Sequence, residues 1–355
     1  MSAPAPWIRA SVRAVPPYVP GEQPAAGRRV IKLNTNENPY PPSPAVLAAL
    51  HDAVDARVRL YPDPEAVALR TEASRVYDVP VDHIMAGNGS DELLALLLRA
   101  VVDPGDRVAF PVPTYSLYET LVAVQGGICD TVAWPADWSL PPALAARDAK
   151  LTVLCNPNSP SGTLVPIEEI DALAARLSGV LVVDEAYVDF AAATALPLVR
   201  RRANVVVLRT LSKSYSLAGL RVGLAFAAPA LLAGLRTVKD SYNLNRLSQA
   251  AAIAALADQA TVRENVARVA RTRARLVEAL RALGYDVPES HANFVLARAT
   301  GVDQAPVAAA LAAGDILVRH FTSHGLGDAL RITVGTDDEI DALLTALRAI
   351  LPPRA

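Results

Sequence analysis

The sequence predicts an α/β protein with a mostly parallel central sheet, helices on both faces of that sheet, and a smaller α/β domain after it. Between residues 83 and 227, short apolar runs alternate with helical stretches, a pattern typical of parallel strands joined by crossover helices. A long alanine-rich segment, Thr261–Leu283, has helical periodicity and no breaker until Gly284. We therefore expect an N-terminal arm at residues 1–30, a large domain at 31–260 and a small domain at 261–355.

The predicted strands of the large domain are short and apolar, and turn residues follow them. In chain order they are Ile31–Leu33, His83–Ala86, Arg107–Phe110, Leu151–Cys155, Val180–Val183, Val205–Leu208 and Val222–Ala227. Helices are expected at Pro44–Arg57, after the first-turn proline Pro64, and at Leu93–Val102. Because ligands of such sheets lie beyond the carboxyl ends of the strands, the residues after each strand are the first candidates for a site.

The small domain is expected to contain three strands and a closing helix. The strands are Phe294–Ala297, Ile316–Val318 and Leu330–Val334. Thr336, with Glu339 three residues later, forms the capping-box pattern that opens a helix.

Composition narrows the class of function. Hydrophobic residues make up 52% of the 355, charged residues 20%, and the formal net charge is −2, which fits neither a disordered chain nor a basic nucleic-acid binder. Small molecules are therefore the expected partners. Cys129 and Cys155 match no zinc motif and are too few for a disulfide scaffold. Without an apolar run of signal-peptide or membrane-spanning length, we expect a soluble, cytoplasmic protein.

Two adjacent carboxylates follow one of the apolar strands directly. Asp184 and Glu185 follow Leu181–Val183 directly, so Asp184 is expected where a buried sheet opens onto its ligand. A carboxylate there favours a cation, and a protonated pyridine nitrogen is one such cation. A helix cap or a metal ligand explains Asp184 equally well at this stage.

Hydroxyl groups and a lysine follow the next strand. Thr210, Ser212 and Arg221 offer hydrogen-bond donors to a phosphate, and Lys213 beside them forms an imine if burial or nearby positive charge lowers its pKa. The turn Gly87–Glu92 precedes an apolar helix and predicts either an anion site at a helix N-terminus or an ordinary capping loop.

Two further patterns are less specific. The loop Asn156–Gly162 is rich in proline, so the Asn156 side chain is expected either to contact a ligand or simply to stabilise a turn. His320 and His324 lie four residues apart in a glycine-containing loop without an evident third ligand, and we expect no metal site there.

Taken in order, these motifs resemble the fold-type I pyridoxal-phosphate-dependent aminotransferases. The resemblance runs from about Ile31 to Ile340 and rests on Gly87–Glu92, Pro113–Tyr115, Asn156–Gly162, Val183–Tyr187 and Arg209–Arg221. More narrowly, the chain is similar to the histidinol-phosphate aminotransferase family in Asn34–Pro39, Arg59–Asp63, Ala292–Phe294 and Leu330–Gly335. Ser159 and Ser161 depart from the pattern, since the family often has asparagine and threonine there.

The resemblance implies a role for each matching residue. Lys213 is the expected Schiff-base lysine and proton carrier, Asp184 the partner of the pyridinium nitrogen, and Tyr187 a neighbour of the ring oxygen. The other expected contacts of the cofactor are Ser90, Asp91, Tyr115, Asn156, Ser212 and Arg221, with Tyr61 reaching the cofactor phosphate of a partner subunit. The expected contacts of the substrate are Arg331, Arg319, Asn156, Tyr18 and Asn36.

The implied activity is transamination between histidinol phosphate and 2-oxoglutarate in histidine biosynthesis, by a homodimer with shared sites. An aromatic amino acid aminotransferase and a phosphothreonine-type decarboxylase are alternatives on the same scaffold. A regulator without turnover is disfavoured because only about thirty residues precede the fold, too few for a DNA-binding domain. A nicotinamide-dependent enzyme is disfavoured because no Gly-x-Gly-x-x-Gly follows the first strand.

Overall fold

The computed structural model describes residues 5–15, 21–24 and 27–351 and places the large domain around one seven-stranded sheet. The strand order is β2-β8-β7-β6-β5-β3-β4. The strands are β2 (Ile84–Gly87), β3 (Arg107–Val112), β4 (Ile128–Ala133), β5 (Leu151–Cys155), β6 (Val180–Asp184), β7 (Val205–Thr210) and β8 (Gly223–Ala227). All neighbours from β7 to β4 pair in parallel, whereas β8 runs antiparallel to both β7 and β2. The predicted mostly parallel sheet is confirmed.

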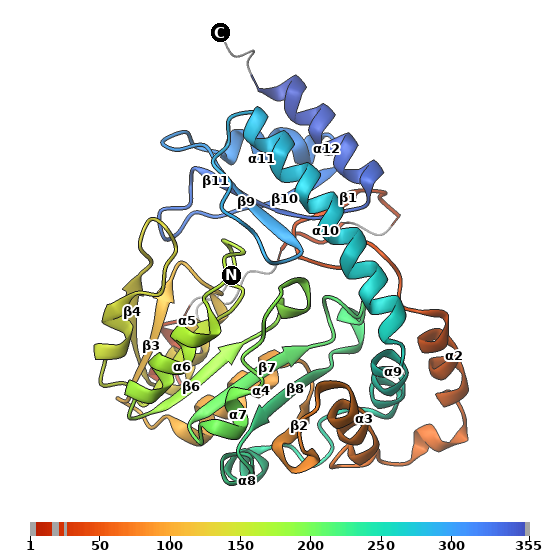
Figure 1. The fold of residues 1–355 in the computed structure, drawn as a ribbon, viewed down its shortest axis with the longest axis vertical. Helices are drawn as coiled ribbons and strands as arrows, with labels where there is room; N and C mark the ends of the chain where they lie inside the picture. Colours follow the sequence, from red (N-terminus) through yellow and green to blue (C-terminus); the bar gives the residue numbers. More distant parts are fainter. Residues whose placement is uncertain (1–4, 16–20, 25–26, 352–355) are drawn as a thin grey trace.

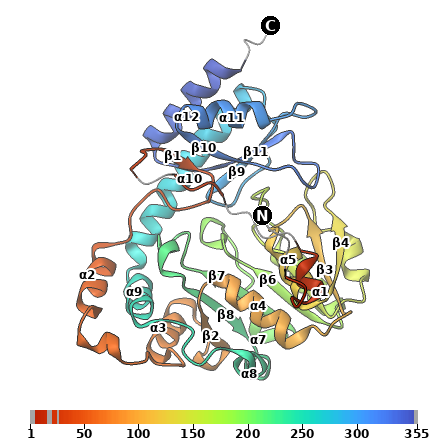
Figure 2. The same cartoon turned by 180° about the vertical axis from the view of Figure 1, so that it is seen from behind.

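Helices cover both faces of this sheet because its central strands are apolar on both sides. In β6, Leu181 and Val183 belong to one buried cluster, while Val182 between them belongs to the other. Helices α4 (Ser90–Val101) and α8 (Pro229–Val238) pack against the second cluster, and Figure 2 shows α4 crossing the strands. The first cluster is covered by α3 (Val67–Tyr77), α6 (Ile167–Arg176), α7 (Leu198–Arg201) and α9 (Arg246–Ala257).

The sequence prediction missed one strand and overextended one helix. β4 lies at the edge of the sheet and is mostly exposed, so it lacks the apolar pattern by which the other strands were found. Helix α2 (Pro44–Ala53) ends before the predicted Arg57, and a separate 3-10 turn covers Ala56–Arg59. A nine-residue helix, α5 (Leu117–Gln125), connects β3 to β4.

A four-stranded sheet with the order β1-β10-β11-β9 forms the small domain. Its strands are β1 (Ile31–Leu33), β9 (Phe294–Arg298), β10 (Ile316–His320) and β11 (Ala329–Thr333), and α11 (Ala305–Ala313) and α12 (Asp337–Ile350) contribute to its core. The assignment of Ile31–Leu33 to the large domain was wrong, because β1 pairs in parallel with β10. The small domain therefore combines segments from both ends of the chain.

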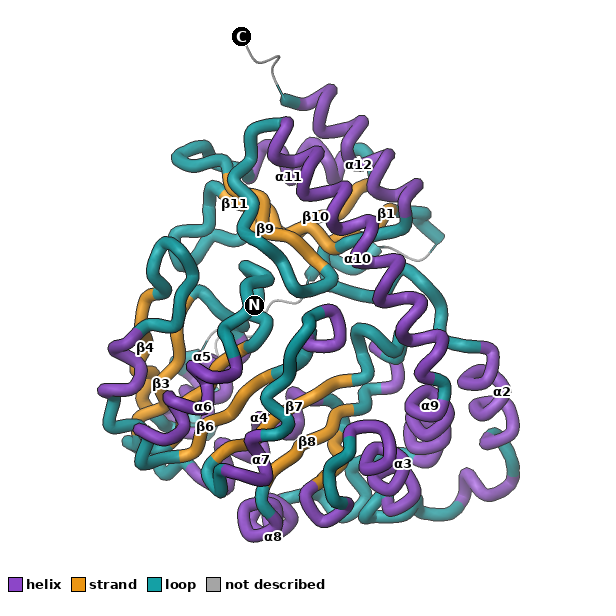
Figure 3. Tube along the Cα trace, in the orientation of Figure 1, coloured by secondary structure: helices purple, strands orange, loops and turns teal. Residues whose placement is uncertain are grey.

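Helix α10 (Gln259–Ala282) connects the two domains as a single long element. Figure 1 shows it rising from α9 beside the large sheet to the small domain, and Figure 3 shows strands at the centre of both domains with helices outside them. The short helix α1 (Ala10–Arg13) of the N-terminal arm lies against α5 of the large domain.

The capping box at the start of α12 gives a test of the local sequence prediction. The Thr336 side chain accepts a hydrogen bond from the Glu339 amide, and the Glu339 carboxylate accepts one from the Thr336 amide at 2.7 Å. Thr336→Ala should lower the free energy of unfolding by about 1 kcal/mol, measured by urea denaturation. Thr345→Ala, an exposed site on the same helix, is the matched control and should change stability by no more than about 0.5 kcal/mol. Equal effects of the two changes would contradict a role for the cap.

Candidate functional site

A cavity of about 550 Å³ lies where the carboxyl ends of the parallel strands face the small domain. The last residues of β5, β6 and β7, which are Cys155, Asp184 and Thr210, all line it. The loop after β10 closes it from the small-domain side, and His324 of this loop lies 3.2 Å from the Glu119 carboxylate on α5. The cavity is thus bounded by both domains, at the edge where ligands of parallel sheets bind.

Most of the site residues expected from the sequence meet in this cavity. Those that line it are Asn36, Ser90, Asp91, Tyr115, Asp184, Tyr187, Ser212, Lys213, Arg221, Arg319 and Arg331. Asn156 and Tyr61 do not line it, and Tyr18 lies outside the described residues.

Lys213 lies in the turn after β7 with its amine in the cavity. Its Nζ donates a hydrogen bond to the Thr35 carbonyl at 3.2 Å and lies 5.8 Å from the centre of the Tyr187 ring. Burial, and secondly the positive charge of Arg331, lower the pKa of Lys213 from 10.5 to about 8. A larger fraction of the amine is therefore neutral and nucleophilic near neutral pH than for an exposed lysine.

Asp184 is buried at the end of β6 and has a partner that the sequence prediction missed. The Tyr118 hydroxyl donates a hydrogen bond to its carboxylate at 2.6 Å, and the Ala186 amide donates another at 3.2 Å. Burial nevertheless raises the pKa of Asp184 to about 6. A carboxylate held in this way favours a cationic partner inside the cavity.

Tyr118 was detectable in principle, because it lies only three residues after Tyr115. The turn that leads into α5 brings the two together: the Tyr118 amide donates to the Tyr115 carbonyl at 3.2 Å, and the two rings meet edge to face with centroids 5.6 Å apart. Tyr115 lines the cavity, and its hydroxyl donates to the Asp91 carboxylate at 3.3 Å. The two tyrosines thus connect the wall of the cavity to Asp184 below it.

An anion cradle is formed where α4 begins. Gly89 has a φ of +82°, and a Cβ there would lie 2.7 Å from the Arg221 guanidinium. A Cβ on Gly223 would lie 2.5 Å from the backbone of Gly89 and Ser90, so both glycines are required by close approach. The α4 N-terminus, the Ser90 and Ser212 hydroxyls and the Arg221 guanidinium converge here, which is an arrangement that suits a phosphate.

Asn36 connects the two domains through its own hydrogen bonds. Its side chain donates to the Tyr187 hydroxyl at 3.0 Å and accepts from the Thr333 hydroxyl at 3.1 Å, while the Asn293 side chain donates to its carbonyl at 3.0 Å. With a φ of +57°, it occupies the left-handed region that asparagine tolerates better than most residues. Its geometry favours positioning of Tyr187, whose pKa burial raises to about 12 so that the phenol keeps its proton.

Asn156 is buried and has the turn-stabilising contacts that were one of its two expected roles. Its carboxamide accepts a hydrogen bond from the Val165 amide at 2.7 Å and donates one to the Val165 carbonyl at 3.1 Å. The side chain therefore fixes its own loop, and a contact between Asn156 and a cofactor or substrate stays a prediction. Ser159 of the same loop does line the cavity, and its hydroxyl accepts from Arg331 at 3.2 Å.

Two guanidinium groups of the small domain face this site. Arg319 on β10 and Arg331 on β11 are opposite each other in the antiparallel pair. Arg331 also donates to the Asn34 carbonyl at 2.9 Å and lies 5.4 Å from the centre of the Phe294 ring. The two cations give this end of the cavity the charge that an anionic group of a substrate requires.

Tyr61 lies away from the cavity of its own chain. Its side chain is 79% exposed, and its ring stacks on Tyr242 with centroids 4.3 Å apart. In the described part of the chain, His, Cys, Asp and Glu form no group of three or more suited to a metal ion. None of the helices in that same part combines the length and apolar character needed to cross a membrane.

Several known proteins are similar to this chain in sequence over nearly its full length. The chain is 47% identical over 346 residues to histidinol-phosphate aminotransferase 1 of Trichormus variabilis, covering 97% of this chain and 99% of that protein. It is 47% identical over 343 residues to the histidinol-phosphate aminotransferase of Geotalea uraniireducens, covering 97% and 99% respectively.

Solved structures agree on the fold. The histidinol-phosphate aminotransferase of Sinorhizobium meliloti, in complex with pyridoxal-5'-phosphate, superposes with a TM-score of 0.84 at 30% identity, covering 92% of this chain and 93% of that one. A Thermus thermophilus aspartate aminotransferase double mutant, at 21% identity, shares the fold with a TM-score of 0.81 over 97% of this chain and 99% of its own. The family model described as aminotransferase class I and II matches residues 28–347. The chain therefore belongs to the class I and II aminotransferase family.

Proposed function

We propose that this enzyme uses pyridoxal phosphate to transfer an amino group between histidinol phosphate and 2-oxoglutarate, giving imidazole-acetol phosphate and glutamate, in histidine biosynthesis. One observation supports this substrate most directly. Arg319 and Arg331 lie opposite each other on neighbouring strands, and both line the same cavity as Lys213. The relatives named above, at 47% identity over nearly the whole chain, support the same substrate.

The residues present fit pyridoxal phosphate. The α4 N-terminus with Ser90, Ser212 and Arg221 would hold its phosphate, and the buried carboxylate of Asp184 would pair with its ring nitrogen. Asp91 would act indirectly, because its carboxylate holds Arg221 at 3.1 Å. Tyr115 would stack on the ring, and Tyr187 would contact the ring oxygen. When bound, the cofactor withdraws electrons from the substrate carbon that loses a proton.

Lys213 would carry the proton during the reaction. With its pKa lowered to about 8, the amine is able to accept the proton from the substrate Cα and deliver it to the cofactor carbon C4′. Tyr118 and the Ala186 amide keep the Asp184 carboxylate in place while the ring nitrogen remains protonated. The position of the cavity between the two domains would limit the access of water to the reacting carbon once the substrate is bound.

The substrate phosphate would bind between Arg319 and Arg331. A dianionic phosphate is able to use two guanidinium groups, whereas one carboxylate is satisfied by a single bidentate arginine. The competing explanation for Arg319 is an ion pair with a protein acid. The same pair would accept a carboxylate of 2-oxoglutarate in the other half of the cycle.

The enzyme is further proposed to act in the cytoplasm as a homodimer with shared sites. Large apolar side chains are exposed together around α2 and the loop that follows it. They are Leu47, Val54, Val58, Leu60, Tyr61 and Val67, with Tyr242 stacked on Tyr61. Burial of such a patch is a common reason for association, and Tyr61 in it would reach the cofactor phosphate of the partner subunit.

The first test concerns the residue that binds the cofactor. Borohydride treatment of the yellow protein should attach the cofactor permanently to Lys213, because hydride reduces the bond between an amine and the cofactor aldehyde to a stable amine. Peptide mass mapping identifies the modified residue, and Lys213→Ala protein should remain unlabelled. Labelling of a different lysine, or no cofactor after reconstitution, would exclude the proposed chemistry.

The second test uses the cost of burying Asp184. The pKa of Asp184 in the folded protein is about 6, above its ordinary value of 3.8. Below pH 4 the carboxyl group is protonated in both the folded and the unfolded protein, so its burial costs no stability. As the pH rises through 6 the buried group has to ionise, and the free energy of unfolding falls. Asp184→Asn should therefore raise the unfolding free energy of the cofactor-free protein by about 2–3 kcal/mol at pH 8, and by roughly half as much at pH 5. Turnover of the cofactor-loaded variant should fall at the same time.

Urea denaturation at the two pH values measures this difference, and Asp148→Asn, which changes an exposed carboxylate, is the matched control. Lower stability of Asp184→Asn at pH 8 would show that the carboxylate is not destabilised by burial. Unchanged turnover at full cofactor occupancy would refute its catalytic role.

The third test addresses the substrate. Arg319→Ala should lower kcat/KM for histidinol phosphate by about 30- to 1000-fold, or about 2–4 kcal/mol, the scale of a lost buried charge-assisted contact. Phenylalanine turnover should fall less. Arg348→Ala, an exposed arginine on α12, controls for the loss of charge. An equal loss for both substrates, or a wild-type preference for phenylalanine, would favour an aromatic amino acid aminotransferase.

A further inference from the structure

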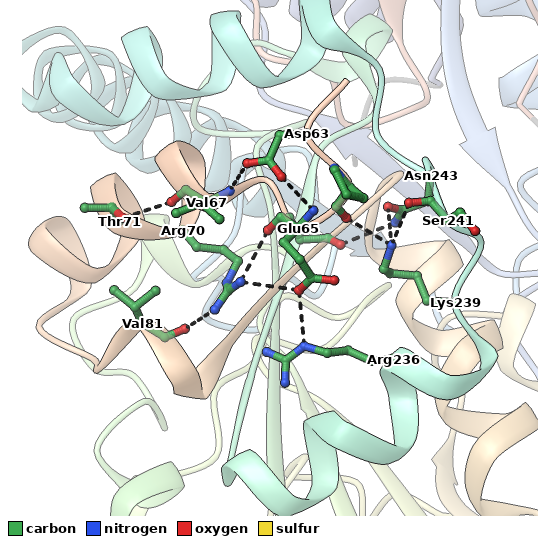
Figure 4. Close-up of polar contacts among 12 residues, drawn as sticks. Asp63, Glu65, Val67, Arg70, Thr71, Val81, Arg236, Lys239, Ser241 and Asn243 are labelled. Atoms are coloured by element: carbon green, nitrogen blue, oxygen red, sulfur yellow. Dashed lines mark hydrogen bonds and ion pairs between the residues drawn. The ribbon is translucent and has the colours of Figure 1, made fainter. Parts of the chain in front are cut away.

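A short segment between α8 and α9, residues 239–243, connects two loops that belong to different parts of the molecule. We call it the α8–α9 connector. On one side it contacts the loop 61–66, which carries Tyr61 (Figure 4). On the other side it contacts the turn 87–92, which forms the anion cradle. None of its residues lines the cavity between the domains.

Lys239 fastens the connector to the Tyr61 loop. Its ammonium group donates to the Pro64 carbonyl at 3.1 Å, to the Asp240 carbonyl at 2.8 Å and to the Asn243 side chain at 3.3 Å. Figure 4 shows Lys239 pointing toward Asn243 and Ser241 beside the loop that contains Asp63 and Glu65. One cation therefore fixes the connector's own shape and its distance from residue 64 at the same time.

The Tyr61 loop depends on contacts of this kind because its tip projects into solvent. Asp63 accepts backbone hydrogen bonds from Glu65 at 3.0 Å and Val67 at 2.7 Å, which orders the base of the loop. Tyr61 itself is 79% exposed and packs on Tyr242 with an interplanar angle of 13°. Since Tyr242 belongs to the connector, the position of the connector determines where the Tyr61 hydroxyl lies.

Asn243 fastens the other side of the connector to the anion cradle. Its amide donates to the Glu92 carboxylate at 2.8 Å and to the Ala86 carbonyl at 3.3 Å, and the Asn88 side chain donates to its backbone carbonyl at 3.1 Å. These contacts hold the turn that precedes α4 within the same subunit. Lys239 and Asn243 therefore support different loops although they are four residues apart.

We propose that Lys239 is a positioning residue that acts in trans, on the cofactor site of the partner subunit, whereas Asn243 acts on the site of its own subunit. The inference rests on the proposed homodimer with shared sites, in which Tyr61 reaches the partner's cofactor phosphate. Loss of Lys239 releases the Tyr61 loop from the connector and weakens phosphate binding in the neighbouring site. Loss of Asn243 loosens the Gly87–Glu92 turn and weakens phosphate binding in the site of the same subunit.

Hybrid dimers separate the two directions. One subunit carries Lys213→Ala, so that only the other, reporting subunit is able to form the covalent bond that borohydride reduces. The dissociation constant of the cofactor is measured from the protein-bound label trapped by borohydride at increasing concentrations of pyridoxal phosphate, without any turnover. Each test change is placed either on the Lys213→Ala subunit, where it acts in trans, or on the reporting subunit, where it acts in cis.

Lys239→Ala in trans should raise the dissociation constant about 3- to 10-fold, the scale of one lost ordinary hydrogen bond, because Lys239 acts indirectly, and less than about 2-fold in cis. Asn243→Ala should give the reverse pattern. Lys239→Arg, which keeps charged donors, should restore most of the trans affinity. Lys150→Ala, an exposed lysine before β5, is the matched control and should have no effect in either position.

The outcomes distinguish this inference from the function on which it rests. If Tyr61→Phe has no effect in trans, while native mass spectrometry shows intact hybrids, the proposed shared site is wrong. If Tyr61→Phe acts in trans but Lys239→Ala acts in cis, in both positions equally or in neither, the positioning role of Lys239 is overturned. Dissociation of the Lys239→Ala dimer would overturn it as well, since that effect is not specific to Tyr61.

Discussion

The buried carboxylate of Asp184 is the feature on which the site depends most. The parallel strands bring it to the bottom of the cavity, where burial raises its pKa to about 6 while two donors, Tyr118 and the Ala186 amide, stabilise the charge. Lys213 lines the same cavity with its pKa lowered by burial and by Arg331. For both groups burial disfavours the charged form that an exposed side chain would adopt, and a bound cofactor with a cationic ring, joined to the lysine, would relieve both costs.

Small residues and fixed turns make this arrangement possible. Gly89 and Gly223 allow the anion cradle to form directly beside β8, because a side chain at either position would collide with Arg221 or with the backbone. The antiparallel β8 is therefore part of the site as well as of the sheet, since its first residue, Gly223, pairs with Gly87, where the turn before α4 begins. The chemistry of the cavity and the packing of the large domain depend on the same close approach.

The two domains are connected at the site itself as well as by α10. Asn36 joins Tyr187 of the large domain to Thr333 of the small one, and Arg331 joins β11 to Ser159 and Asn34. Because β1 pairs with β10, the segment that carries Asn34 to Asn36 enters the cavity from the small-domain sheet. A change in the angle between the domains would therefore move Asn36 and Arg331 relative to Tyr187 and the anion cradle. The hydrogen bonds of Asn36 therefore help to set the relative position of the two domains at the site.

The sequence by itself determined the α/β class, nearly all the strands, the long connecting helix and the positions of Asp184 and Lys213 at the carboxyl ends of two neighbouring strands. These features have a regular periodicity or lie directly after an apolar run, so local residues are sufficient to predict them. Tertiary structure alone decided that β1 joins the small sheet, that Asn156 binds Val165 while Ser159 faces the cavity, and that Tyr118 donates to Asp184. In loops the direction of a side chain has no period, because it depends on which distant backbone groups still need a hydrogen-bond partner.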